Sequence, residues 1–270
     1  MAEITIGIVQ LASTGCKQEN ISKLKKLIAR CSADLVVLPE YFMANIRSLS
    51  PAEVYSISES VDGWFVNEIS KLAIEYSAYI LATMFEKSRN PPKVYNSALL
   101  INPKGSIECI YRKIHLFDAY GYRESDYIIH GDRPSPIVSV KSARIAIAIC
   151  FDIRFPELYR YYAVKGANMI INPSAWYRGP FKEETLRFLA QARAHENTVY
   201  MVIANQCGKY FTGRSMIVNP YGVVEVDLGV EERYLEYQVD LSLVDRVREI
   251  LPVLKLRRSE VYRDMWSNIQ

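Results

Sequence analysis

Short runs of apolar, mostly β-branched residues recur along the chain, and amphipathic patterns separate several of them. Runs of this length and composition are typical of buried strands. Apolar residues at helical spacing form stripes that begin at Ile21, Val66 and Leu186. Strands that alternate with helices predict a layered α/β fold. The predicted strands cover residues 4–10, 35–38, 79–84, 98–101, 145–149, 169–171 and 199–203.

Two hairpins are predicted, and they make the sheets mixed rather than purely parallel. A Pro-Lys-Gly turn divides the run at 98–101 from one at 107–111, and an Asn-Pro-Tyr-Gly turn divides 215–218 from 223–226. The 270 residues contain no Gly/Ser linker and no low-complexity segment. We therefore expect a single domain over residues 1–270.

Composition and charge exclude several classes of protein. The formal net charge of +3 is too small for a chain of this length to favour nucleic acid. The cysteines, at 16, 31, 109, 150 and 207, are odd in number and lack C-x-x-C spacing, which argues against a disulfide framework or a zinc cage. The first residues resemble no signal peptide, no apolar run could span a bilayer, and no glycine-rich phosphate motif is present. We expect a cytoplasmic protein without metal, cofactor, nucleic-acid or membrane partner.

Cys150 lies where an apolar strand gives way to a helix. The run at 145–149 leads into it, and Pro156, favoured in the first turn of helices, opens the pattern that follows. Ligand sites of open α/β sheets gather at the carboxyl ends of strands. A nucleophile on such a turn is exposed, and neighbouring backbone N–H groups can face a substrate oxygen. A small buried residue is the alternative interpretation, since most cysteines are buried.

Two charged residues also stand at strand ends. Glu40 follows Pro39 after the buried run at 35–38, where a carboxylate is unfavourable unless it has a partner or a role. Lys113 follows the run at 107–111. Taken singly, the glutamate also fits a surface salt bridge, and the lysine fits an ordinary solvated position.

Together these residues form a chemical set. A cysteine needs a base to become a thiolate. Attack on a carbonyl creates an oxyanion, which needs a positive charge or hydrogen-bond donors. The leaving amine needs a proton, and a carboxylate that took one from the thiol can return it. Glu40, Lys113 and Cys150 meet these needs, and none of the histidines, at 115, 130 and 195, has an obvious triad context.

The same residues lie in three motifs that closely resemble those of the nitrilase superfamily, in the same order. The motifs are Leu-Pro-Glu40, Tyr-Arg-Lys113-x-His-Leu-Phe and Cys150-Phe-Asp-x-Arg-Phe-Pro-Glu. Three further segments are similar to the family's pocket loop, conserved helix and late hairpin, at 172–176, 191–197 and 213–222. The resemblance runs from about Ile4 to Tyr262, nearly the whole chain.

The resemblance implies a four-layer α-β-β-α sandwich that assembles by burying one sandwich face on another. It implies a homodimer or a higher even homo-oligomer, with the tail at 250–270 docked on the partner subunit. Tyrosines at 159, 161 and 162 favour an interface at that helix. It also implies a second glutamate near the lysine, matched by Glu124, and an oxyanion-hole N–H from Phe151. The irregular stretch at 117–136 would then form the active-site rim.

The residues after the nucleophile resemble the amidase branch of the family, which includes omega-amidases. Cys150-Phe151-Asp152 replaces the Cys-Trp-Glu usual in true nitrilases, which argues against a nitrile substrate. The resemblance implies hydrolysis of a small aliphatic amide, including carboxylate-bearing omega-amides, to an acid and ammonia through a cysteine thioester. An N-carbamoyl amino acid amidohydrolase is one alternative, and a non-catalytic binding or scaffold protein on the same fold is another.

Substrate-binding residues are expected around the three motifs. Arg154 fits two roles equally, a bidentate contact with a substrate carboxylate or a structural ion pair with Glu157. Aromatic residues on the loops are candidate pocket walls, although such residues also occur at interfaces. The expected substrate-binding residues are Tyr41, Tyr120, Arg154, Ser174 and Trp176, with Phe42 and Tyr177 as further wall candidates.

Overall fold

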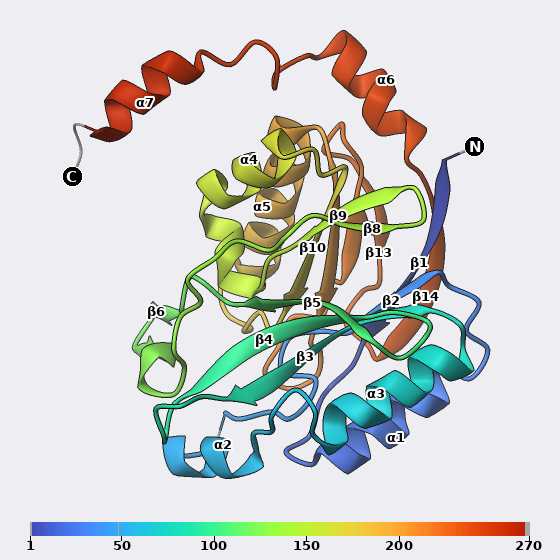
Figure 1. Ribbon diagram of the computed structural model, residues 1–270, viewed down its shortest axis with the longest axis vertical. Coiled ribbons are helices and arrows are strands. Elements are labelled where there is room, and N and C mark those ends of the chain that lie inside the picture. Colours follow the sequence, from blue (N-terminus) through green and yellow to red (C-terminus); the bar gives the residue numbers. More distant parts are fainter. Residues whose placement is uncertain (1, 48, 268–270) are drawn as a thin grey trace.

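Two six-stranded sheets pack face to face, and helices cover the outer face of each (Figure 1). The structure, a computed structural model, describes residues 2–47 and 49–267. Both sheets contain parallel and antiparallel neighbours. The predicted four-layer α-β-β-α sandwich with mixed sheets is confirmed.

The first sheet carries most of the amino-terminal half of the chain. Strands β1, β2 and β3 run parallel, and the other neighbours run antiparallel. Helices α1 (Lys17–Leu27) and α3 (Trp64–Glu75) pack apolar stripes on its outer face, and α2 (Pro51–Ile57) follows a capping box. The strand order is β14 (Arg233–Asp240), β1 (Glu3–Gln10), β2 (Leu35–Val37), β3 (Tyr79–Lys87), β4 (Val94–Ile101) and β5 (Ile107–Arg112).

The second sheet has the same plan of a parallel centre and antiparallel edges. Strands β9, β10 and β11 run parallel. Helices α4 (Pro156–Val164) and α5 (Lys182–Asn197) cover its outer face. The strand order is β13 (Val224–Asp227), β12 (Met216–Val218), β11 (Tyr200–Asn205), β10 (Met169–Ser174), β9 (Ala143–Ile147) and β8 (Val138–Val140).

Burial on both faces explains why the central strands have continuous apolar sequences. In β2, Leu35 and Val37 pack in the cluster that includes the second sheet, whereas Val36 packs with the helices α1 and α3. Successive side chains of a strand point to opposite faces, so a strand covered on both faces needs apolar residues throughout.

The carboxyl ends of the parallel strands bring the predicted site together. Glu40 follows β2, Cys150 follows β9, and Ala175 follows β10. The backbone N–H of Ala175 donates to Oε2 of Glu40 over 2.9 Å, so the two sheets are joined at this edge. Binding sites of α/β folds form at such ends because the loops diverge there.

The stretch at 117–136 is more ordered than its sequence predicted. It contains a two-stranded hairpin of β6 (Asp118–Ala119) and β7 (Tyr122–Arg123), followed by the 3-10 turn η1 (Glu124–Asp126). The turn buries Glu124 completely. The hairpin lies beside the cavity described below, since the Lys182 ammonium packs on the Tyr120 ring.

After β14, the chain forms an arm of two helices, α6 (Ser242–Ile250) and α7 (Ser259–Ser267) (Figure 1). Helix α6 packs Val244 in the core cluster of the sandwich, and beyond α6 the arm arches past α4. The predicted tail at 250–270 falls within this arm, except for residues 268–270, which lie outside the described residues. No helix of the described ranges is long and apolar enough to cross a membrane.

Most of the tyrosines that predicted an interface at α4 belong to the core of the subunit itself. Tyr159 and Tyr162 are fully buried, and their hydroxyl groups bond Asn172 and the carbonyl of Ile147. Only Tyr161 is exposed. Two of the three tyrosines therefore fill the space between α4 and the second sheet and are closed to a partner.

Candidate active site

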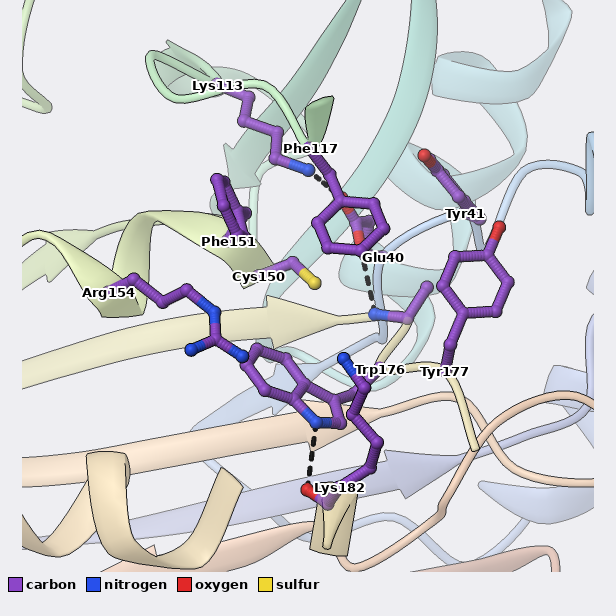
Figure 2. A pocket seen from close by; sticks show the side chains of 11 residues that line it. Glu40, Tyr41, Lys113, Phe117, Cys150, Phe151, Arg154, Trp176, Tyr177 and Lys182 are labelled. Carbon is purple, nitrogen blue, oxygen red and sulfur yellow. Dashed lines mark hydrogen bonds and ion pairs between the residues drawn. The ribbon is translucent and has the colours of Figure 1, made fainter. Parts of the chain in front are cut away.

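A cavity with a total empty space of about 380 Å³ opens at the carboxyl ends of the parallel strands (Figure 2). This space includes the open mouth of the cavity, and the part enclosed by the lining side chains is much smaller. Figure 2 shows the Cys150 sulfur pointing into the space between the aromatic side chains. The lining residues are Glu40, Tyr41, Lys113, Phe117, Cys150, Phe151, Arg154, Ala175, Trp176, Tyr177 and Lys182.

Cys150 begins the 3-10 turn η2 (Cys150–Arg154), which links β9 to α4. Its backbone has φ of 44°, a left-handed conformation that is strained for a residue with a side chain. Pro156 then opens α4 in the first helical position, as the sequence predicted. This sharp turn holds the Cys150 sulfur at the cavity, although Cys150 is only 7% exposed.

Glu40 is the residue that joins the other groups. Its Oε1 accepts from the Lys113 ammonium over 2.9 Å and from the Asn96 amide over 2.8 Å, and the Cys150 thiol lies beside the carboxylate. Burial raises the pKa of Glu40, although the positive charge of Lys113 opposes this. A carboxylate with a raised pKa is a better proton acceptor than one in water.

Lys113 lies between two carboxylates. Its Nζ is 2.9 Å from Oε1 of Glu40 and 2.8 Å from Oε2 of Glu124, and the side chain is 1% exposed. Burial opposes the charge of the ammonium, but Glu124 and Glu40 outweigh burial, and the pKa of Lys113 is raised well above its usual range. The side chain is therefore a fixed positive charge beside the sulfur.

Glu124 forms an ion pair with Lys113 but does not line the cavity. Its Oε2 accepts from the backbone N–H of Phe117 over 2.7 Å, and its Oε1 accepts from the hydroxyl of Tyr41 over 3.2 Å. These contacts fix both the carboxylate and the start of the hairpin. The structure thus places the predicted second glutamate against the lysine.

The surroundings of the Cys150 sulfur favour the neutral thiol. Burial raises its pKa well above the usual range, and the negative charge of Glu40 adds to this, while Lys113 opposes it. The arrangement pairs a protonated thiol with an adjacent proton acceptor. Such a pair can form the nucleophile at the moment of attack, when a substrate carbonyl arrives.

The expected substrate-binding residues differ in where they lie. Tyr41, Arg154 and Trp176 line the cavity, and the Arg154 guanidinium packs over the Trp176 ring at 4.9 Å from its centroid. Ser174 does not line it, because its buried hydroxyl donates to Oδ1 of Asn172 over 2.7 Å. Tyr120 is 76% exposed on the hairpin and contacts the site through two lining residues, Lys182 and Phe117.

Two contacts of the site were not foreseen from sequence. Asn96, in β4, donates to both Glu40 and Glu124, over 2.8 and 3.3 Å. Lys182, the first residue of α5, places its ammonium over the Tyr120 ring at 3.6 Å. The available signal for Asn96 was an amide side chain shortly before the apolar run of β4, with Ser97 as its polar neighbour. Lys182 had no comparable signal, because lysines at helix starts are usually solvated.

The candidate active site has the components of covalent hydrolysis. It combines a thiol, an adjacent carboxylate that can accept its proton, and a fixed ammonium that can face a developing oxyanion. The described residues contain no group of three or more His, Cys, Asp or Glu side chains placed to hold a metal ion.

Comparisons with known proteins agree with this geometry. Residues 5–249 match the family model described as carbon-nitrogen hydrolase. The chain is 34% identical over 276 residues to a deaminated glutathione amidase of Rattus norvegicus, across 95% of this chain and 83% of that one. It is 30% identical over 277 residues to an omega-amidase of Xenopus tropicalis, across 97% and 98%. Among solved structures, the NitFhit protein of C. elegans has a TM-score of 0.88 at 28% identity, across 97% of this chain and 66% of that longer chain.

Proposed function

The chain belongs to the carbon–nitrogen hydrolase family, and on that premise we propose that it hydrolyses a small linear amide to a carboxylic acid and ammonia. The observation that carries the proposal is the buried cluster of Cys150, Glu40 and Lys113 at the cavity. A purely structural role does not account for a strained cysteine placed against a carboxylate with a raised pKa.

In the first half of the reaction, Glu40 takes the proton of the Cys150 thiol as the sulfur attacks the amide carbon. The carbonyl oxygen becomes an oxyanion, which the Lys113 ammonium and the backbone N–H of Phe151 stabilise. This N–H makes no hydrogen bond to another residue in the ranges 2–47 and 49–267, so it is free to donate. The carbon–nitrogen bond then breaks, and Glu40 returns the proton to the leaving nitrogen.

The second half hydrolyses the thioester on Cys150. Glu40, again a carboxylate, takes a proton from water as the water oxygen attacks the thioester carbon. The carbon–sulfur bond breaks, the sulfur recovers the proton, and the acid leaves. Glu124 acts as a positioning residue in both halves, because its carboxylate holds Lys113 without lining the cavity.

Ammonia release from a panel of compounds tests this proposal. The panel contains linear amides, N-carbamoyl amino acids and aliphatic nitriles. We expect release from amides and an acyl adduct on Cys150 in mass spectra of a rapidly quenched reaction. Turnover of the carbamoyl compounds alone would favour an N-carbamoyl amino acid amidohydrolase, and no turnover of any compound would favour a binding or scaffold protein.

We propose further that the amide carries a carboxylate at its other end. Two cavity cations, Arg154 and Lys182, form no ion pair with any carboxylate in the described part of the chain; both pack on aromatic rings instead. The expected structural pair of Arg154 with Glu157 is absent among these described residues, and Nε of Arg154 is buried without a hydrogen-bond acceptor. A substrate carboxylate would supply that acceptor.

Monoamides of dicarboxylic acids, compared with neutral alkyl amides of equal length, test the carboxylate. We expect kcat/KM to favour the charged series, and Arg154→Met or Lys182→Met to reduce that preference by about 10- to 100-fold, the value of a charged hydrogen bond. Lys209→Met is the matched control, since this lysine lies over the Tyr210 ring but does not line the cavity. Equal preference in the variants and the wild type would contradict the assignment.

We also propose a homodimer or a higher even oligomer. Helix α4 and the arm enclose a groove of about 690 Å³ whose lining includes Tyr161, Val164, Leu256 and Tyr262, all exposed apolar side chains. Exposed apolar surface of this kind favours a partner. A second copy of the chain is the partner that a twofold contact would supply, since the same patch is present on both copies.

A reducing cytoplasm remains the proposed location. All five cysteines are unpaired, and Cys16 is exposed. A reducing compartment keeps such thiols, including the proposed nucleophile, from oxidising. Cell fractionation tests this, with the soluble cytoplasmic fraction as the expected result and recovery from an oxidising compartment as the contrary one.

A further inference from the structure

Asp152, two residues after Cys150, is a fully buried carboxylate whose two oxygens each accept two hydrogen bonds. Oδ1 accepts from the backbone N–H of His115 over 3.0 Å and from the ring Nδ1 of His115 over 2.8 Å. Oδ2 accepts from the hydroxyl of Tyr111 over 2.7 Å and from the backbone N–H of Ile149 over 2.8 Å.

The chemistry of these contacts requires a carboxylate. Each oxygen of Asp152 accepts from a backbone N–H, Oδ1 from that of His115 and Oδ2 from that of Ile149, and a carboxylate is the side chain with two accepting oxygens. In Asp152→Asn, the NH₂ group would replace one of the two oxygens and would face the backbone N–H of His115 or of Ile149, which is also a donor. The same reasoning assigns the proton of the His115 ring to Nδ1, because its partner oxygen can only accept.

His115 makes a second contact with the same turn. Its ring stacks on Phe155, with centroids 3.6 Å apart and an interplanar angle of 8°. Phe155 follows the last residue of η2 and immediately precedes α4. His115 therefore contacts the nucleophile turn at two points, through Asp152 in its middle and through Phe155 at its end.

These contacts join the two sheets at the catalytic edge. Tyr111 and His115 stand two residues before and two residues after Lys113, at the end of the first sheet. Ile149 and Asp152 stand on either side of Cys150, at the end of the second. The segment that carries the proposed oxyanion donor is thus bonded directly to the turn that carries the proposed nucleophile.

From this arrangement we infer that His115 is a positioning residue, which acts through Asp152 and Phe155 to fix the Lys113 ammonium relative to the Cys150 sulfur. The inference rests on the proposed function for the roles of Lys113 and Cys150. Catalysis by positioned groups is sensitive to displacements of about 1 Å, which lower rates about 10²-fold. Without the contacts of His115, the Lys113 segment and the Cys150 turn can shift relative to each other.

Two substitutions of His115, to Asn and to Gln, both remove the ring, but only one of them keeps the hydrogen bond to Asp152. The amide nitrogen in His115→Asn occupies the place of ring Nδ1, so it still donates to Asp152. The amide nitrogen in His115→Gln occupies the place of Nε2 and points away from Asp152. We expect His115→Gln to lower kcat about 10²-fold with a much smaller change in KM, and His115→Asn to stay within about 10-fold of the wild type.

The alkylation rate of Cys150 gives a readout that does not depend on amide turnover. It is measured by mass spectrometry after timed exposure to iodoacetamide. We expect alkylation to slow in His115→Gln and to recover in His115→Asn, with the melting temperature recorded for each variant. Phe155→Leu removes the stacking on His115 but keeps the hydrogen bonds of Asp152. We expect it to lower the alkylation rate by an intermediate amount. This variant also tests the inference if His115→Gln does not fold. His195→Gln is the matched control, because His195 is exposed on α5 and its side chain lies against Gly222.

The outcomes distinguish this inference from the proposed function. Equal kcat and equal alkylation rates in His115→Asn and His115→Gln overturn the inference while leaving amide hydrolysis intact. If the wild type releases no ammonia from any amide, the proposed function fails, and the alkylation rates still decide whether His115 positions the turn. The double variant His115→Gln/Asp152→Asn should lose little kcat beyond that lost in Asp152→Asn alone. Both substitutions break the same contact between residues 115 and 152.

Discussion

At the scale of single residues, the Glu40 carboxylate contacts the lysine, the thiol and the backbone of the loop after β10. Its two oxygens serve different partners. Oε1 accepts from Lys113 and Asn96, whereas Oε2 accepts from the N–H of Ala175. The carboxylate proposed as the proton acceptor thus also contributes a hydrogen bond between the two sheets at this edge.

Cys150 should be the thiol whose alkylation abolishes activity. Burial raises the pKa of Cys109 to about 11 and that of Cys207 to about 12, and neither has a carboxylate placed as Glu40 is placed beside Cys150. Cys150→Ala should remove turnover while the fold is kept, and Cys150→Ser should be severely impaired, since an alcohol is the weaker nucleophile at neutral pH.

Iodoacetamide labelling followed by peptide mass spectrometry checks this expectation. Cys16→Ser is the control, because Cys16 is exposed and will be labelled without consequence for activity. Full inactivation with label on the other thiols and none on Cys150 would falsify the assignment.

The pH profile of kcat/KM should rise through the pKa of Glu40. Below that pKa the carboxyl is protonated and cannot accept the thiol proton; above it the carboxylate is ready. Because burial raises this pKa, the acid limb should lie above the usual carboxyl range. Lys113 has a pKa raised well above its usual range and should keep its charge across neutral pH.

Initial rates over a range of pH measure this profile, and Glu40→Gln is the comparison. We expect that variant to lose about 10²- to 10⁴-fold in kcat, the value of general base catalysis, together with the acid limb. Glu124→Gln should be milder, because Glu124 acts through Lys113. A Glu40→Gln enzyme with near wild-type rates would exclude Glu40 as the base.

At the scale of the elements, sequence reasoning worked where burial is complete and was weaker where it is partial. The apolar runs of β1, β2, β9, β10 and β11 were predicted because both faces of these strands are covered. Strand β14 was missed, because it lies at a sheet edge, is mostly half-buried and carries charged residues. Its position beside β1 depends on a pairing across the whole chain, which local pattern does not encode.

Some residues of the candidate site could likewise be predicted from sequence, and others could not. Glu40, Lys113 and Cys150 could be named because each follows a recognisable strand and lies in a motif. Asn96 and His115 could not be assigned a role, because their importance comes from contacts between segments far apart in sequence. Ser174 was named from its loop alone, and the fold turns its hydroxyl to Asn172.

The β6–β7 hairpin should influence substrate affinity through Lys182. The Tyr120 ring supports the Lys182 ammonium by a cation–π contact, worth about 0.5–1 kcal/mol at an exposed site. Tyr120→Leu should therefore raise KM for a carboxylate-bearing amide about 2- to 5-fold. Tyr120→Phe keeps the aromatic face and is the matched control; steady-state kinetics should leave its KM near the wild type. The same rise in KM for both variants would mean that the hydroxyl, not the ring face, supports Lys182.

At the scale of the whole molecule, the proposed assembly would bring copies of the chain together through the arm and α4. Exposed apolar side chains of the arm, including Ile250, Leu256 and Met265, have no cover from the sandwich of the same chain. We expect light scattering at micromolar concentration to give an even multiple of 31.0 kDa. A mass near 31.0 kDa itself would reject assembly.

Removal of residues 255–270 tests the contribution of the arm. The deletion takes away α7 and the Leu256 and Tyr262 side chains of the groove. We expect a smaller assembly and a lower kcat, because α4 starts beside the nucleophile turn and would lose its cover. An unchanged oligomer after deletion would show that the arm does not hold the copies together.

The pairing of β1 with β14 bears on when the protein becomes reactive during its synthesis. β1 is synthesised long before β14, its outer neighbour, so the sheet that holds Glu40 and Lys113 is complete only after Asp240 has been added. The thiol emerges earlier, without a complete set of partners around it. We therefore expect a chain that stops before β14 to carry Cys150 beside an incomplete first sheet and to lack the proposed hydrolytic activity.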